Sequence, residues 1–404
     1  MRLPYAELAS NPRWRRWTMA TGLSRVTVAA APLALVIGGH YATGSWSDGA
    51  VLAGVYAFAE ALAAPWHGRR LDRAETRAGL TRALAGGGAG LAALLAGLLS
   101  RAALPWLIAA TIWAAAISAG VQGGLRAWLP ELTGAEHAQA AFALDASLLE
   151  IEWLSAPALV AIAALLGAPF LGVGAMLAAT VAALAALRLL PRRPPAGTAP
   201  RGPSPWRSRP ARRSYLVSAS FGYTEGIITV GLAPLLAALH SRPGYAGLFL
   251  VGLSLASAAG GFAFGALGGR VPGSSERQAN IILAGLGLLA LPVALAGSPW
   301  AAAAAVAAFG LLIAPLNGLR TQLLSRAVSP AQRAQAFSIM YAAMGAGFGL
   351  AGLAAGILLG PLGIRGVIAT AAAAAVLTAL TAGLSRDRQE PATVPAARRA
   401  GQLY

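Results

Sequence analysis

Six ionisable side chains stand out because they lie inside long apolar stretches of this 404-residue chain: Arg25, Glu60, Asp145, Glu150, Glu152 and Glu225. If these stretches cross a bilayer, each ionisable group at its centre costs roughly 2.5–3.5 kcal/mol on insertion scales and needs a partner, water or a function. A carboxyl group that faces a cavity there can alternate between a protonated and an ionised state. Such alternation is the chemistry of proton coupling.

Three of these acids share one apolar stretch, residues 141–164. At 3.6 residues per turn, Asp145 and Glu152 lie almost on one helix face, and Glu150 is rotated by about 140° from Asp145. We expect one face to line a central cavity and the other to meet a neighbouring helix, and the sequence leaves open which is which. We expect Asp145 to be structural. Arg25 either neutralises a Glu or holds an anionic group of a substrate, and Glu60 either lines the cavity or bonds to a neighbouring helix.

The elements that carry these residues are apolar windows long enough to span a membrane. The chain is 57% hydrophobic and only 11% charged, which exceeds what a soluble core can bury. A spanning helix needs about 20 apolar residues, so an all-α membrane protein of about twelve transmembrane helices is predicted. The windows fall near 17–40, 47–66, 79–99, 102–124, 141–164, 167–189, 214–239, 244–267, 278–297, 299–319, 337–358 and 362–384.

Arginine placement predicts the orientation, because Arg and Lys gather in short cytoplasmic loops. One set of alternate loops carries Arg13, Arg15, Arg16, Arg69, Arg70, Arg73, Arg77, Arg126, Arg270, Arg277, Arg326 and Arg333. The opposite loops carry Arg101, Arg242 and Arg365. Both termini are therefore predicted to be cytoplasmic, in a multi-pass protein of a bacterial cell membrane.

The chain repeats itself. GAEHAQA at 134–140 matches PAQRAQA at 330–336, and other landmarks recur at nearly the same separation. We expect pseudo-symmetric six-helix bundles over 1–190 and 214–385, a cytoplasmic Pro/Arg-rich linker over 191–213, and a cytoplasmic tail over 386–404. Paired halves around a central site are typical of transporters.

The loop after the second window, GRRLDRAETR, resembles the signature of the major facilitator superfamily. Gly68, Asp72, Arg73 and Arg77 occupy the Gly, Asp and basic positions of that signature, while Glu75 replaces its second Gly. The resemblance implies a cytoplasmic gating motif in which Asp and Arg form a charge lock that breaks during the conformational change.

Two further stretches, LRAWLPEL at 125–132 and AFALDASLLEIEW at 141–153, resemble poorly characterised major facilitator proteins of actinobacterial type. The resemblance implies two bundles that alternate between inward-open and outward-open states. It also places an acidic residue at the position of Glu150, which makes that residue the first candidate for proton coupling. The transport and proton-coupling candidates are, in order, Glu150, Glu225, Glu152, Glu60 and Arg25.

We therefore predict a monomeric secondary transporter, not an enzyme, that exports a small hydrophobic or cationic compound in exchange for protons. Uptake of a small metabolite, by proton symport or facilitated diffusion, is the alternative. A non-transporting scaffold or a lipid-modifying enzyme is less favoured, because no nucleophile–base pair or phosphate-binding loop is recognisable. Without cysteine, and with scattered histidines, no metal site or cofactor is expected. Basic residues spread between apolar windows argue against nucleic-acid binding.

Overall fold

A computed structural model describes residues 10–73, 76–133, 138–191, 205–267, 272–328 and 333–384, and every regular element in these ranges is helical. The first half contains α2 (Pro12–Thr43), α3 (Trp46–Arg73), α4 (Thr76–Leu99), α5 (Leu104–Ser118), α6 (Val121–Ala127), α7 (Leu129–Thr133), α8 (Ala138–Leu165) and α9 (Leu171–Leu187). The second half contains the short 3₁₀ helix η1 (Pro205–Arg207), α10 (Arg209–Ala238), α11 (Tyr245–Leu267), α12 (Ser275–Ala294), α13 (Pro299–Gly310), α14 (Ile313–Ala327) and α15 (Arg333–Leu384).

The all-helical class is confirmed, and eight of the described helices are long and apolar enough to cross a membrane. Among them, α15 is two helices in sequence, because Gly363 has non-helical backbone angles (φ 63°, ψ 172°). The predicted windows at 337–358 and 362–384 fall on its two parts. The total of twelve spans and the side on which the termini lie stay predictions.

Two predicted windows are interrupted where one continuous helix was expected. The fourth window breaks between α5 and α6, at Gly120, whose φ of 84° suits a residue without a side chain. The tenth breaks between α13 and α14. Because α6 and α14 extend each window, Arg126 and Arg320 lie on helices. The assignment of Arg126 to a loop was therefore wrong.

Local signals explain where several helices begin. Asn11, Ser208 and Ser298 each accept a hydrogen bond from a backbone N–H in the first turn that follows, and each is followed by a proline at the first or second helical position. As a result α10 begins at Arg209, inside the predicted linker 191–213, of which residues 192–204 lie outside the described ranges.

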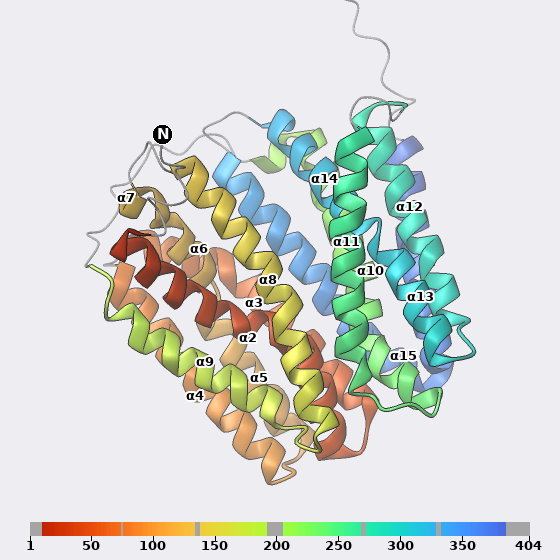
Figure 1. Cartoon of the computed structure of the whole chain (residues 1–404), viewed down its shortest axis with the longest axis horizontal. Coiled ribbons are helices and arrows are strands. Elements are labelled where there is room, and N and C mark those ends of the chain that lie inside the picture. Colours follow the sequence, from red (N-terminus) through yellow and green to blue (C-terminus); the bar gives the residue numbers. More distant parts are fainter. Residues whose placement is uncertain are drawn as a thin grey trace, which may run out of the picture.

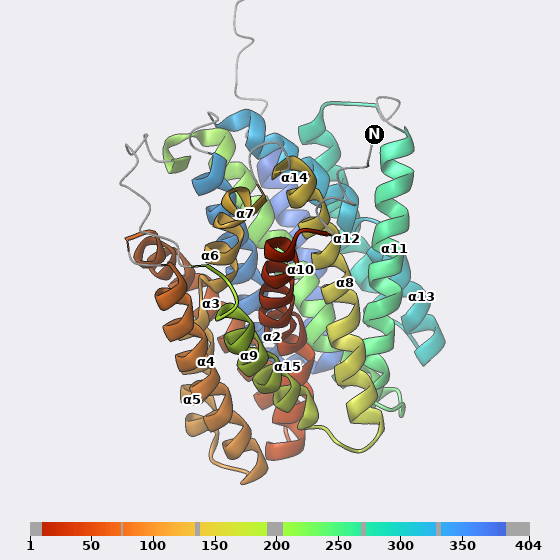
Figure 2. The same ribbon diagram turned by 60° about the vertical axis from the view of Figure 1, so that its left-hand side comes forward.

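The two halves lie side by side, with the first part of α15 between them (Figure 1). Across this boundary α3 packs on α15 and α8 packs on α11, as the turned view also shows (Figure 2). Glycines allow the close approach: a Cβ on Gly54 or Gly352 would meet the backbone of the opposite helix, and one on Gly247 would meet Pro157 and Ala161. Small residues at such seams are a usual way to bring membrane helices together.

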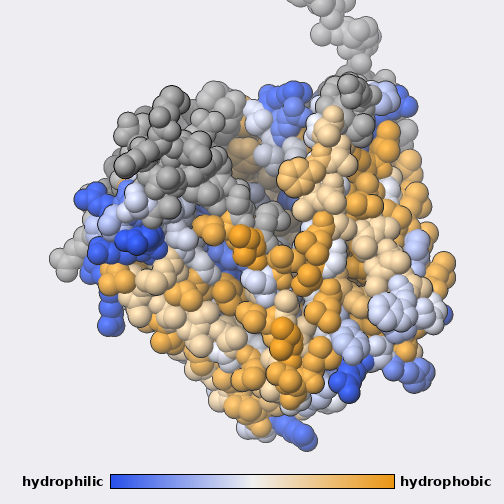
Figure 3. All heavy atoms as spheres, viewed as in Figure 1, coloured by the Kyte–Doolittle hydropathy of each residue, from blue (hydrophilic) through white to orange (hydrophobic). Residues whose placement is uncertain are grey.

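The halves separate towards the end at which α2 and α10 begin. The α3–α15 contact runs through Gly349 and reaches Gly345, which faces Ala61. One turn further, Tyr341 on α15 is 47% exposed, and on the opposing helix Leu62 is 65% exposed. A recess between the halves is visible at this end (Figure 3). The structure is thus open towards the predicted cytoplasmic side.

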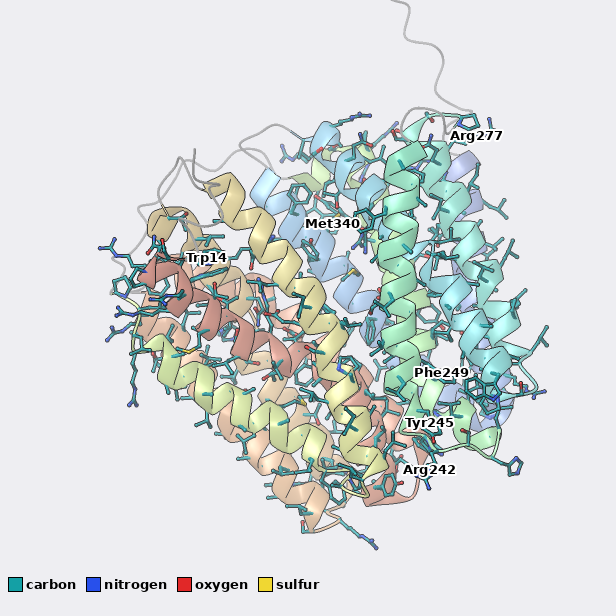
Figure 4. All side chains as sticks on the ribbon, viewed as in Figure 1. Trp14, Arg242, Tyr245, Phe249, Arg277 and Met340 are labelled. Atoms are coloured by element: carbon teal, nitrogen blue, oxygen red, sulfur yellow. The ribbon has the colours of Figure 1, made fainter. Side chains whose placement is uncertain are left out.

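The outer face carries a broad apolar band with hydrophilic residues at both ends (Figure 3). Arg277 and Arg242, from loops predicted to lie on opposite sides of the membrane, lie at opposite ends of the molecule (Figure 4). This arrangement fits a chain that crosses the bilayer with its helices roughly along the membrane normal.

Candidate functional site

A buried ion-pair network lies inside the first half, around Arg25 on α2. Its Nη2 atom is 2.7 Å from Oδ1 of Asp145, and its Nη1 atom is 3.7 Å from Oε2 of Glu152. The other oxygen of Asp145, Oδ2, lies 3.0 Å from Nε of Arg126 on α6. Asp145 is only 1% exposed and therefore ties α8 to two different helices.

As the helical spacing predicts, Asp145 and Glu152 point to the same neighbour. Glu152 also reaches α2 at Gly22, where an added Cβ would lie 3.1 Å from Oε1 of the glutamate. The 3.7 Å separation from Arg25 exceeds hydrogen-bonding distance, so Glu152 is held less tightly than Asp145. The sequence left open whether Arg25 pairs with an acid or holds an anionic group of a substrate. This geometry shows Arg25 paired with acids.

Hydrogen bonds extend the network towards a cavity. Nε of Arg25 donates to Oε1 of Gln122 at 3.3 Å, and Nε2 of Gln122 donates to Oγ of Ser24 at 3.2 Å. Both Gln122 and Ser24 line a small cavity of about 20 Å³ among helices of the first half. The ion pairs and the cavity therefore form one continuous polar region.

Glu60 lines the same cavity, together with Tyr56 from the same helix. The remaining polar lining is formed by hydroxyl groups: Ser24, Thr27, Ser118 and Thr180. Glu60 thus lines a space inside the first bundle that is bounded by both hydroxyl groups and apolar side chains. A space of this size can hold about one water molecule.

Fewer contacts are described for the other predicted residues, Glu150 and Glu225. Glu150 belongs to α8, but its side chain lies outside the described residues. Glu225, on α10, interacts electrostatically with Arg320 of the second half. The network around Arg25 therefore contains Glu152, and Glu60 lines the cavity that Gln122 and Ser24 of this network also line.

The predicted gating motif lies at the end of α3 and the start of α4. Gly68, Asp72 and Arg73 belong to the last turns of α3, and their side chains lie outside the described residues. Arg77 donates from Nη1 to the backbone oxygen of Leu190 at 2.9 Å, which ties α4 to the end of α9. The charge lock itself stays a prediction.

Arg320 lies on α14, one residue beyond the tenth predicted window at 299–319. The search for ionisable residues inside these windows therefore missed it. Arg320 is 4% exposed. Its guanidinium carbon lies 4.7 Å from the ring centroid of Phe221, and Nη2 lies 3.0 Å from Sδ of Met344. The tripeptide Gly-Leu-Arg, present at both 124–126 and 318–320, was the signal that could have found it.

Among the described residues, no three His, Cys, Asp or Glu side chains are grouped closely enough to hold a metal ion. The polar groups of the first half instead comprise carboxylates, arginines, an amide and hydroxyls. The carboxylates can bind and release protons, and the arginines can exchange ion-pair partners.

Residues 214–403 match the model of the Major Facilitator Superfamily. Solved transporters of this fold superpose on almost the whole chain. By sequence this match covers the second half of the chain, and by fold almost the whole chain is similar to such transporters. No curated protein matches it by sequence.

Several solved structures share this major facilitator fold at low sequence identity. The nucleoside transporter NupG is 15% identical, with a TM-score of 0.70 over 91% of this chain and 99% of its own. A peptide transporter of the POT type, in complex with sulfate, is 15% identical, with a TM-score of 0.74 over 96% and 99%. A bacterial homologue of the human lysosomal transporter Spinster, in an inward-facing conformation, is also 15% identical, with a TM-score of 0.69 over 95% and 100%. At these identities the likeness shows the fold of a membrane transporter.

Proposed function

We propose that this protein is a proton-coupled secondary transporter of the major facilitator type that moves a small molecule by alternating access. The observation that carries the proposal is the unequal sharing of Arg25, at 2.7 Å from Asp145 and 3.7 Å from Glu152. An acid that is loosely held in a buried ion pair can be neutralised by a proton while its neighbour keeps the arginine in place. Glu152 is therefore the proposed proton carrier, with Glu60 as its partner across the cavity.

The position of Glu152 on α8 links its charge to the contact between the halves. Ionised Glu152 attracts Arg25 and draws α8 towards α2, whereas protonated Glu152 leaves Arg25 to Asp145. Further along α8, Pro157 and Ala161 touch α11 at Gly247. A change in the attraction between α2 and α8 therefore acts on a helix that contacts the second half, which is how a protonation step can bias two conformations.

The proposed direction is export of a small hydrophobic or cationic compound from a bacterial cell, by a monomer that contains both halves of its own pathway. Uptake by proton symport is the alternative. Flux under an imposed gradient distinguishes them, because antiport and symport move substrate in opposite directions relative to the proton.

The test uses the full chain in proteoliposomes with an imposed pH gradient and a panel of dyes, antibiotics and metabolites. We expect gradient-driven transport that an uncoupler abolishes. Glu152→Gln removes coupling but leaves downhill exchange, because the neutral side chain mimics the protonated state. Glu60→Gln lowers the coupled rate.

Glu276→Gln is the matched control. It breaks another Arg–Glu pair, in which Nη1 of Arg213 lies 3.2 Å from Glu276, but that pair is at a helix start and partly exposed. This variant is expected to transport like the parent. Coupled transport that survives Glu152→Gln unchanged would remove this residue as the proton carrier, and absence of any flux in the parent would contradict the function itself.

A further inference from the structure

Arg320 is a buried cation whose hydrogen-bonding capacity is mostly unused. Its Nε and Nη1 atoms are buried and have no hydrogen-bond partner, and no ion pair with it is present among the described residues. Its contacts are the ring of Phe221 and the sulfur of Met344. Buried guanidinium groups are normally paired, so an unpaired one marks a place where an anion is missing.

The first half of the chain supplies an internal comparison. Arg126 and Arg320 occupy the same place in the repeated Gly-Leu-Arg tripeptide, and the AQA repeat aligns Asp145 with Tyr341. In the first half, Nε of Arg126 is 3.0 Å from Asp145. In the second half Tyr341 interacts electrostatically with Arg320 in the corresponding place but brings no carboxylate. The chain thus keeps the arginine in both halves, whereas among the described residues only the first of them forms an ion pair with an acid.

The second arginine lies next to the opening between the halves. Tyr341 is on the α15 face that contacts α3, one turn beyond the last contact at Gly345, and it is 47% exposed. Met340, its neighbour in sequence, is buried and marks the level of this site (Figure 4). A ligand that enters the recess therefore meets Tyr341, which is close enough to Arg320 for an electrostatic interaction. Glu225 also interacts electrostatically with Arg320.

We propose that Arg320 binds an anionic oxygen-bearing group, a carboxylate or phosphate, of the transported compound. Two parallel N–H groups of a guanidinium, Nε with Nη2 or Nη1 with Nη2, match the two oxygens of these anions. In Arg320 such a pair forms when Nη2 turns a hydrogen from the Met344 sulfur to the anion. The inference rests on the proposed transport function and narrows its substrate to compounds that carry an acidic group beside their hydrophobic or cationic part. Amphiphilic acids and zwitterions meet both conditions.

The test measures binding without any gradient, so that it stands apart from proton coupling. Purified protein in detergent is titrated with matched pairs of compounds, each an acid and its uncharged amide or ester, and with inorganic phosphate, and thermal unfolding is followed by Trp fluorescence. We expect the acid of at least one pair to raise the midpoint and its amide to have no effect. Arg320→Gln lowers the apparent affinity on the order of tenfold or more, since a charge-assisted hydrogen-bonded pair is lost.

Two further variants keep the test decisive. Tyr341→Asp recreates the arrangement of the first half, so it raises the midpoint without ligand and abolishes the response to acids. Arg326→Gln, which removes an exposed arginine from the same helix, leaves binding unchanged.

Acid binding that survives both Arg320→Gln and Tyr341→Asp would overturn the proposal, as would a response to acidic phospholipid alone. If acids bind through Arg320 but Glu152→Gln transports normally, only the proton-coupling proposal fails. If Glu152→Gln loses coupling but no acid binds, only the proposal that Arg320 binds an anion fails.

Discussion

Replacing Asp145 by Asn should destabilise the first half more than any other single conservative change to its polar groups. Asp145 is 1% exposed and has Arg25 at 2.7 Å and Arg126 at 3.0 Å. Asn keeps the shape and one acceptor oxygen but loses the charge that both arginines need. The loss of stabilising free energy differs between the two arginines, because one is buried and the other is partly exposed.

Removing one partner of a buried ion pair costs about 3–5 kcal/mol. The side chain of Arg126 is 38% exposed, so it can turn to water and adds at most about 1 kcal/mol. Arg25 is buried and keeps Glu152 at 3.7 Å and the hydrogen bond to Gln122 at 3.3 Å. The lower end of the range therefore applies, and we expect a loss of about 3 kcal/mol, which is roughly a hundredfold in the unfolding equilibrium.

The assay is a reversible unfolding titration in mixed detergent micelles, followed by Trp fluorescence. Glu276→Gln serves as the surface-pair control, with an expected change of about 0–1 kcal/mol. The double variant Arg25→Met with Asp145→Leu should lose much less than the sum of its single changes, because no uncompensated charge remains. A change below about 0.5 kcal/mol for Asp145→Asn, or strict additivity in the double variant, would refute the view that this network is a coupled, buried set of charges.

Three other predictions follow from described contacts. Trp17→Phe removes the 2.7 Å hydrogen bond from the indole Nε1 to the backbone oxygen of Leu125 and should cost about 1 kcal/mol in the same titration; no loss would show that water replaces the indole. Gly352→Leu wedges α3 and α15 apart at their closest contact, so reporter cysteines at the predicted outer end should become more accessible to a membrane-impermeant reagent. Unchanged accessibility would mean that this contact does not hold the end closed. Because the chain has no cysteine, topology can be read directly: Gly297→Cys should label in intact cells and Arg207→Cys only after permeabilisation, and the reverse result would overturn the predicted orientation.

Helical periodicity was enough to predict that Asp145 and Glu152 share a face, and composition was enough to predict an all-helical membrane protein. The partner helices could not be predicted in the same way. Arg126 reaches Asp145 because the chain breaks at Gly120 and continues as α6, and a hydropathy window does not register such a break. Glu60 illustrates the same limit, since its apolar surroundings in sequence do not reveal that it faces a cavity among several distant helices.

The two pseudo-symmetric halves also differ at positions that bear on function, and a comparison of their matching residues alone overlooks these differences. The Gly-Leu-Arg tripeptide is identical in the two halves, yet Asp145 faces one arginine and Tyr341 the other. In the first half the charges cancel, so a proton added to Glu152 changes ion pairing without an ion entering from outside. In the second half Arg320 has Glu225 as an electrostatic neighbour but no described ion pair, so under our proposal an anion from the recess completes its coordination. If proton and substrate act on opposite halves in this way, coupling need not pass through direct contact between them: each ligand changes the attraction within its own bundle, and the shared boundary of α3 with α15 and α8 with α11 responds to both.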